Sequence, residues 1–543
     1  MRIALKKRAV LLAMVSICLF ALYSPLARAQ PSSPSYSYDM SFDSDGVTTV
    51  EIRYNGGAPG SGSSWVAVPK NFTRTVTPLA GEITSLAYLQ YRVGGEQGTN
   101  LFYDNMTFSY SSGNAPFSMR VSFNLTDGAM IVEPNGLFYS PLIGVPQSAT
   151  VEAKLTLPEG VTDVRDAEPT PASVDDSRSR VNLLFRVTSE TRIAVTFKVP
   201  WAMQTDRIGE ANIEADVPSR YADLGNRVVA LCRNAVPLMD DLFKKSVDRI
   251  SVKFFVPLTF QQFGIGGYTP IDASTFRTGS IFLNVLYVRS SPGMIETIAI
   301  HELTHQYEAG AGISPELLWV QEGLANYVAV QMAKALGYDA ASTEADLEAT
   351  ARELNGQYGA IQQWRTDTIS SLFQYYAASY EIFRTLGEQY GDLSFYSRFF
   401  HGVAELKDGL RSTNVAVCQL GVAAGVDLSP EFTNWGFELV DLSGIRTEIA
   451  RLRAEASWYG PLLPFRQQAL DHLDLAQSSI DTAPEVATGH VRIAAFYIET
   501  VPMIIAGVLL VLILLVAIAV IAGRRNGRKH AQKEPSVTSQ QSP

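Results

Sequence analysis

The sequence of 543 residues predicts an α+β multidomain protein. We expect a β-sandwich-like domain first, a domain with a mixed sheet and helices next, and a helical stalk with a single transmembrane helix last. Three observations carry this prediction. Short alternating runs separated by turn residues extend to about residue 200, strand and helix patterns follow one another in the middle, and an uncharged apolar run covers 501–522.

The composition is that of a globular protein, with 46% hydrophobic and 18% charged residues. The formal net charge is −10. It implies no basic face that could displace counterions from phosphates, so we expect no nucleic-acid partner.

The N-terminus is predicted to be a secretory signal peptide over 1–29. A basic start precedes an apolar run over 9–23, and Ala-Arg-Ala at 27–29 gives the small-x-small pattern of a cleavage site. The apolar run is short for a bilayer span, which favours cleavage over anchoring.

Residues 30–203 are predicted to form the β domain. Runs such as 48–54, 119–123 and 192–197 alternate or are apolar, and Gly, Pro, Asn and Asp turns separate them. This pattern favours a sandwich. Whether the domain lines one side of a substrate cleft or acts as a spacer stays open.

Residues 204–442 are predicted to form the catalytic domain. The pattern is helical over 206–244, and strands are expected at 250–256 and 280–285, before the helix that carries two histidines. The edge strand of such a mixed sheet can hold an extended substrate by main-chain pairing.

Residues 300–307 read IHELTHQY and contain the HExxH pattern. His301 and His305, four residues apart on one helix face, can both reach one zinc ion, and Glu302 is placed to handle the attacking water. A catalytic zinc takes three protein ligands and leaves one position open. Glu322, on the next helix, completes a His-His-Glu set, so we expect one Zn²⁺ per chain.

These segments resemble the gluzincin metallopeptidases, which are thermolysin-like, and more closely the aminopeptidase N family. The second zinc helix of that family reads much like WxxEGxAxY, and residues 319–327 here read WVQEGLANY. The resemblance implies a gluzincin catalytic domain with His301, His305 and Glu322 as zinc ligands and Glu302 as general base. The gap between His305 and Glu322 is slightly shorter than usual in these families. Because 310–315 is loop, we interpret the difference as a trimmed turn.

Residues 266–277, GGYTPIDASTFR, resemble the family's G-A-M-E-N stretch, which implies a substrate-binding role for four residues. They are Gly266, Gly267, Tyr268 and Thr269. Thr269 stands where the family has a glutamate that pairs with the peptide's α-amino group, and a neutral hydroxyl cannot form that ion pair. We therefore expect cleavage that needs no free N-terminus, unless Asp272, the nearest acid, substitutes.

Residues 374–381, QYYAASYE, resemble the family's P-Y-E-K-G segment. The resemblance places Tyr376 where those enzymes have a tyrosine that faces the zinc and donates a hydrogen bond to the oxyanion. Tyr375 and Tyr380 remain alternatives for this role.

The C-terminal part is predicted to be a helical juxtamembrane stalk over 443–498, a transmembrane helix over 499–523 and a basic cytoplasmic tail over 524–543. The basic tail directly follows the apolar run, so the positive-inside rule places the tail in the cytoplasm and the large N-terminal ectodomain outside.

The remaining histidines and cysteines give weaker signals. His401, His472 and His490 are isolated in the sequence, which favours surface or capped histidines. Cys232 and Cys418 could form a disulfide or remain thiols.

The sequence thus predicts a membrane-anchored extracytoplasmic zinc metallopeptidase with a peptide or protein substrate and one helix in the lipid bilayer. A strict aminopeptidase and a catalytically silent zinc-binding surface protein are the alternatives. The intact Glu302 weighs against a silent protein, because a binding protein has no use for a base there. An intramembrane protease is disfavoured because polar Gln306 and Glu308 follow the histidines.

Overall fold

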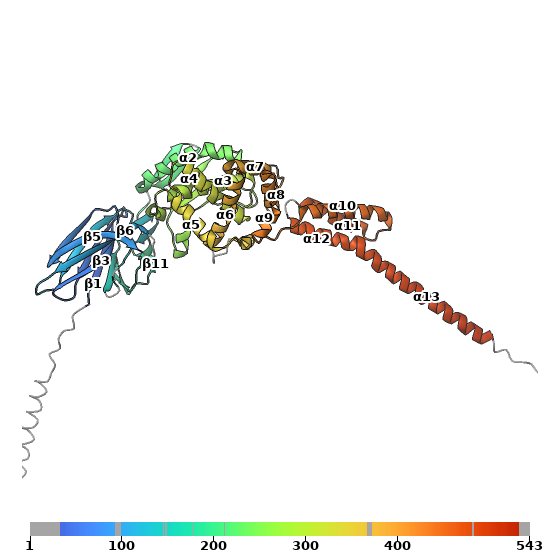
Figure 1. The fold of residues 1–543 in the computed structure, drawn as a ribbon, viewed down its shortest axis with the longest axis horizontal. Coiled ribbons are helices and arrows are strands. Elements are labelled where there is room, and N and C mark those ends of the chain that lie inside the picture. Colours follow the sequence, from blue (N-terminus) through green and yellow to red (C-terminus); the bar gives the residue numbers. More distant parts are fainter. Residues whose placement is uncertain are drawn as a thin grey trace, which may run out of the picture. The chain divides into compact units, whose positions relative to one another are not determined.

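The computed structural model describes residues 33–92, 99–144, 146, 149–177, 179–202, 204–210, 212–365, 372–480 and 483–531 (Figure 1). The expected signal peptide and the end of the basic tail lie outside these residues. The chain divides into two compact units. The first contains 1–232, 249–268 and 280–299, and the second contains 233–248, 269–279 and 300–543.

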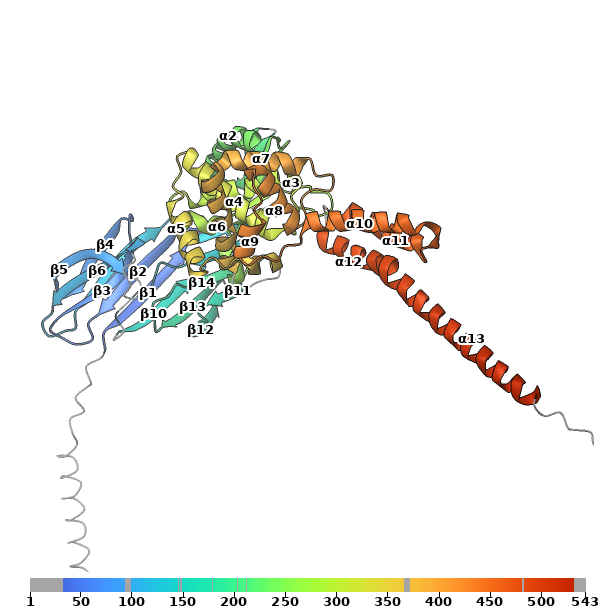
Figure 2. The ribbon, with the colours of Figure 1, turned by 45° about the vertical axis from the view of Figure 1, so that its right-hand side comes forward.

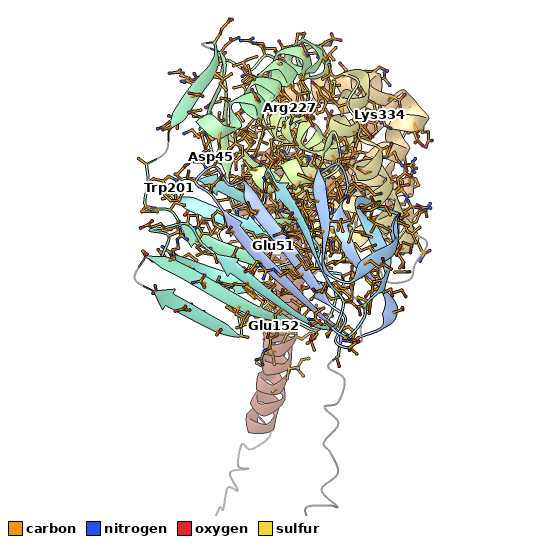
Figure 3. All side chains as sticks on the ribbon, turned by 90° about the vertical axis from the view of Figure 1, so that its left-hand side faces the viewer. Asp45, Glu51, Glu152, Trp201, Arg227 and Lys334 are labelled. Atoms are coloured by element: carbon orange, nitrogen blue, oxygen red, sulfur yellow. The ribbon has the colours of Figure 1, made fainter. Side chains whose placement is uncertain are left out.

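A seven-stranded sheet forms much of the first unit, in the order β12-β13-β10-β1-β2-β7-β4. Its strands are β1 (Ser35–Phe42), β2 (Thr48–Asn55), β4 (Arg74–Ala80), β7 (Ser118–Leu125), β10 (Thr150–Thr156), β12 (Ser173–Ser177) and β13 (Arg180–Val187). Buried and exposed residues alternate along β1, β7 and β10, as expected for strands with one face in a core. Figure 3 shows Glu51 and Glu152 on the exposed face of this sheet.

Two smaller sheets share the core of the first sheet. The three-stranded sheet contains β3 (Ser61–Pro69), β6 (Thr99–Ser111) and β5 (Glu82–Arg92), in that order, and the four-stranded sheet contains β11 (Asp163–Glu168), β14 (Ala194–Lys198), β9 (Asn135–Tyr139) and β8 (Ala129–Val132). One cluster of buried side chains joins all three sheets, with Ile52, Phe108 and Phe197 as examples. Sheets packed face to face over a common core are sandwich-like.

A five-stranded mixed sheet completes the first unit, in the order β15-β16-β17-β19-β18. Its strands are β15 (Thr205–Glu210), β16 (Ile213–Pro218), β17 (Ile250–Phe255), β19 (Ile281–Asn284) and β18 (Gly267–Tyr268). β16, β17 and β19 run parallel, while β15 and β18 are antiparallel to their neighbours. β17 and β19 confirm the strands expected at 250–256 and 280–285.

The helical pattern expected over 206–244 was wrong in its first part. Residues 205–218 form the β15–β16 hairpin, and helix α2 begins only at Ala222 and runs to Phe243. β16 supplies buried apolar side chains next to β17, including Ala215 and Val217. This tertiary burial outweighs the local helical periodicity.

Helices fill the second unit. They are α3 (Met294–Ala311, which begins in the first unit), α4 (Leu318–Ala335), α5 (Ala341–Glu353), α6 (Leu372–Tyr390), α7 (Asp392–Ala404), α8 (Thr413–Ala424) and α9 (Ser429–Asn434). α4 is buried on nearly every side, and α6 packs along it (Figure 2). Most of its residues are apolar, as in other core helices, and Lys334 and Ala335 at its end are exposed.

A sharp cap explains the short connection between α3 and α4. Gly312 has φ +87°, and the Ile313 N–H donates 3.0 Å to the carbonyl of Glu308. A glycine in this left-handed conformation ends a helix by turning the chain away from its axis. α4 can then begin only a few residues later, at Leu318.

The segment expected as a stalk folds on itself. α10 (Leu442–Tyr459), α11 (Arg466–Ser479) and α12 (Pro484–Ala495) pack together around buried Ile449, Leu452 and Leu473. Two histidines that are isolated in the sequence meet here, because the Nδ1 atoms of the half-buried His472 and His490 lie 2.9 Å apart between α11 and α12.

The last helix, α13 (Val501–Ala531), contains the expected apolar run. The continuous helical stretch Val486–Ala522 is the only one among the described residues long and apolar enough to cross a membrane. Its apolar side chains are exposed all round, as Met503 (68%) and Ile513 (64%) illustrate.

Cys232 and Cys418 differ in environment. Cys232 is a free and buried thiol on α2, and burial raises its pKa to about 12. Cys418 is exposed on α8. Cys232 therefore stays a thiol in this structure rather than half of a disulfide.

Candidate metal centre

Three potential metal-ligand atoms converge where α3 and α4 meet. His301 Nε2 lies 3.1 Å from His305 Nε2 and 3.2 Å from Glu322 Oε2, and His305 Nε2 lies 3.7 Å from the same oxygen. Among the described residues, this is the only group of three or more His, Cys, Asp or Glu side chains spaced to hold a metal ion.

These separations fit a zinc ion. Zinc–ligand bonds of about 2.0–2.1 Å at tetrahedral angles put neighbouring ligand atoms about 3.3 Å apart. The three observed distances lie on both sides of that value. Glu322 Oε2 is also buried beside Nε2 of both histidines, and burying a carboxylate is costly unless a cation faces it.

Local sequence explains how each ligand is placed. His301 and His305 are one turn apart on α3, so both rings leave the helix on one face. Glu322 lies in the second turn of α4, which the Gly312 cap allows to start close by. A Cβ at Gly323 would lie 2.5 Å from the Phe383 ring of α6, so only glycine allows α6 this close to α4.

Glu302 is almost fully buried, with 3% of its surface exposed. Thr269 Oγ1 lies 3.0 Å from Glu302 Oε2 and 3.0 Å from its backbone oxygen, so the hydroxyl can donate to either. Burial raises the pKa of the Glu302 carboxyl, while the nearby His301 and His305 partly oppose that rise. Glu302 is not one of the three candidate metal ligands, His301, His305 and Glu322. Its carboxyl is therefore available for proton transfer.

Tyr376 lies beside these acids on the second turn of α6. Burial, and then the charges of Glu322 and Glu302, hold the pKa of its phenol well above the usual value. The hydroxyl therefore stays protonated near neutral pH, as a hydrogen-bond donor must.

Tyr376 and its two alternatives differ in their surroundings. Tyr375 packs edge-on against Trp364, with ring centroids 5.6 Å apart. The hydroxyl of fully buried Tyr380 faces α5, where it donates 3.4 Å to Glu344. Of the three tyrosines, only Tyr376 has Glu302 and Glu322 as its main charged neighbours.

The four expected substrate-binding residues lie at and just after the edge of the mixed sheet. Gly267 and Tyr268 form β18, which pairs only with β19 among the described strands. The Tyr268 ring stacks on Phe282 and is 43% exposed. A Cβ at Gly266 would lie 2.9 Å from the Ile298 side chain. Thr269 follows β18 directly, and its hydroxyl is engaged with Glu302 as described above.

Asp272 is engaged in its own turn. Its Oδ1 accepts hydrogen bonds from the backbone and hydroxyl of Ser274, at 3.0 and 2.6 Å, and from those of Thr275, at 2.8 and 2.9 Å. These hydrogen bonds, with that from the Ser274 hydroxyl first, lower the pKa of Asp272 to about 2. The carboxylate thus organises the loop that follows β18.

One residue of the centre was not predicted. Glu308 is fully buried on α3, and its Oε2 lies 2.8 Å from His305 Nδ1. The signal was available in the sequence, because an acid three residues after a helical histidine shares its face.

No protein-family model matches this chain, and no curated protein matches it. The solved structures that it is similar to include the following three. Aminopeptidase A of Legionella pneumophila, in complex with aspartic acid, has 15% identity and a TM-score of 0.33 over 76% of this chain and 50% of that one. An M1 zinc metallopeptidase mutant from Deinococcus radiodurans, bound to a Tyr-Ser-Ala substrate, has 13% identity and a TM-score of 0.32 over 75% and 96%. An aminopeptidase N family protein from Idiomarina loihiensis has 14% identity and a TM-score of 0.32 over 76% and 78%. At identities and TM-scores this low, we draw no conclusion about this chain from them.

Proposed function

We propose that this chain is a zinc metallopeptidase that hydrolyses peptide bonds with a metal-activated water. The observation that carries the proposal is the spacing of His301, His305 and Glu322 around one point, with buried Glu302 next to the first histidine. Zinc, when bound, would supply Lewis-acid activation of the water and of the scissile carbonyl.

The chain's own groups would move the protons and bind the developing charge. Glu302 accepts a proton from the attacking water and passes it to the leaving amine, a role suited to a carboxylate whose pKa burial has raised. The protonated Tyr376 hydroxyl donates a hydrogen bond to the oxyanion that forms as water adds to the carbonyl.

The metal dependence can be tested directly. The full chain, purified in detergent, should contain about one zinc per chain and hydrolyse members of a mixed peptide library. Removing the metal with a chelator should abolish hydrolysis, and added zinc should restore it. The chelator already saturated with zinc is the control. Unchanged hydrolysis by protein that elemental analysis shows to be metal-free would refute the proposal.

We also propose that α13 anchors the protein in a membrane. The β domain (30–203), the catalytic domain (204–442) and the helical stalk (443–498) would then all lie outside the cell. Apolar side chains exposed around the whole helix support an anchor, because water disfavours such a surface and a hydrocarbon core of about 30 Å accepts it. The basic cluster that begins at Arg524 supports a cytoplasmic C-terminus. Whether protease added to intact cells reaches the large domain tests this orientation.

We further propose that cleavage does not require a free N-terminus. An aminopeptidase needs an acid to pair with the cationic α-amino group of its substrate. The hydroxyl of Thr269 contacts Glu302, and Asp272 Oδ1 accepts four hydrogen bonds within its own turn. The three acids described at the centre also have other proposed roles: Glu302 as base, Glu322 as metal ligand and Glu308 as partner of His305.

An internally quenched peptide with a free and with an acetylated N-terminus tests this selectivity. We expect the two forms to be hydrolysed at rates within a few-fold of each other. The acids described above all have other partners, so none of them should form an ion pair with the free α-amino group. Asp272→Asn should leave that ratio unchanged. Hydrolysis of the free form alone, with the preference lost in Asp272→Asn, would instead identify an aminopeptidase with Asp272 as anchor.

A further inference from the structure

Glu308 is the one acid of the centre that neither the metal nor the proton transfer uses. It is 0% exposed, and its Oε2 lies 2.8 Å from His305 Nδ1. The other ring nitrogen of His305, Nε2, faces His301 Nε2 at 3.1 Å and Glu322 Oε2 at 3.7 Å. One imidazole thus connects Glu308 to the convergent ligand atoms.

The stability of the fold does not explain why a carboxylate is buried at Glu308. Burial removes its hydration, and Glu308 Oε1 makes no hydrogen bond to the described residues. A half-satisfied buried carboxylate usually costs more than an apolar side chain of similar size at the same place. Among the described residues, the Glu308 side chain makes its hydrogen bond with His305, and this contact is where its contribution is expected.

We propose that Glu308 is a positioning residue for the metal centre, an inference that rests on the proposed zinc site. The His305 Nδ1–H donates to Glu308 Oε2, which keeps the proton on Nδ1 and leaves the Nε2 lone pair directed toward His301 and Glu322. The same hydrogen bond holds the ring plane and makes Nε2 a better electron donor to a cation. The i, i+3 spacing on α3 sets this contact by helix geometry alone.

Two substitutions separate the hydrogen bond from the charge. Glu308→Leu removes the acceptor and suits the buried site, and Glu308→Gln keeps an acceptor without the charge. We expect zinc affinity, measured on the full chain by competition with a chromophoric chelator, to fall about 10- to 100-fold in Glu308→Leu and by less in Glu308→Gln. The metal-free Glu308→Leu protein should unfold at the same temperature as the unmodified protein or higher.

Glu296→Leu is the matched control. Glu296 is also a buried acid of α3, but its charged partner is Arg227, at 3.8 Å. Its loss should leave zinc affinity unchanged, even if the helix becomes less stable.

The outcomes distinguish failure of the proposed zinc site from failure of the positioning role of Glu308. Unmodified protein that binds no zinc would refute the proposed function itself. Normal zinc affinity in both Glu308 variants would overturn the positioning role alone. If neither Glu308 variant folds while Glu296→Leu does, Glu308 serves folding, and the positioning role is likewise overturned.

Discussion

Replacing Glu302 by glutamine should lower peptide hydrolysis by at least about a thousandfold while zinc content stays near one ion per chain. Glutamine has nearly the same shape but cannot accept the proton of the attacking water. The three ligand atoms belong to His301, His305 and Glu322, so the metal should not depend on this carboxylate. Thr269 can still donate to the amide oxygen that replaces Glu302 Oε2, which should keep the side chain in place.

Elemental analysis and steady-state kinetics on the same preparation give the measurement. Glu296→Gln, on the same helix and away from the centre, should retain full activity. Zinc loss in Glu302→Gln would mean that Glu302 is a ligand or a structural group, and the proposed proton transfer would be wrong.

Tyr376→Phe should lower kcat by roughly a hundredfold with little change in KM. The phenol contributes a donor to an oxyanion that exists only after water has added, so its loss should affect turnover more than substrate binding. The ring remains in the variant, and its edge-on packing with Trp364, at 5.1 Å between centroids, should be kept. Stability should therefore change little.

The neighbouring tyrosines provide matched controls for that measurement. Tyr375→Phe and Tyr380→Phe should both keep turnover within a few-fold. The Tyr380 hydroxyl donates to Glu344 of α5, whereas Glu322 and Glu302 are charged neighbours of Tyr376. Normal turnover in Tyr376→Phe, or a hundredfold loss in either control, would move the oxyanion role to another residue.

Local spacing in the sequence was enough to predict that His301, His305 and Glu322 lie close enough together to hold a metal ion. Helix periodicity places His301 and His305 on one face, and the need for a third ligand pointed to Glu322 on the next helix. The same kind of reasoning identified β17, β19 and the apolar helix, since each depends on residues close together in the chain.

Only the tertiary structure showed contacts between segments far apart in the sequence. Thr269 meets Glu302 across 33 positions, and His472 meets His490 between two packed helices. The β15–β16 hairpin likewise forms where the local pattern favoured helix, because β16 gains a partner strand in β17. Glu308 lies between these cases, since its spacing from His305 is local but its full burial is not. Sequence periodicity determines which side chains share a face, whereas packing decides which faces meet and which polar groups lose water.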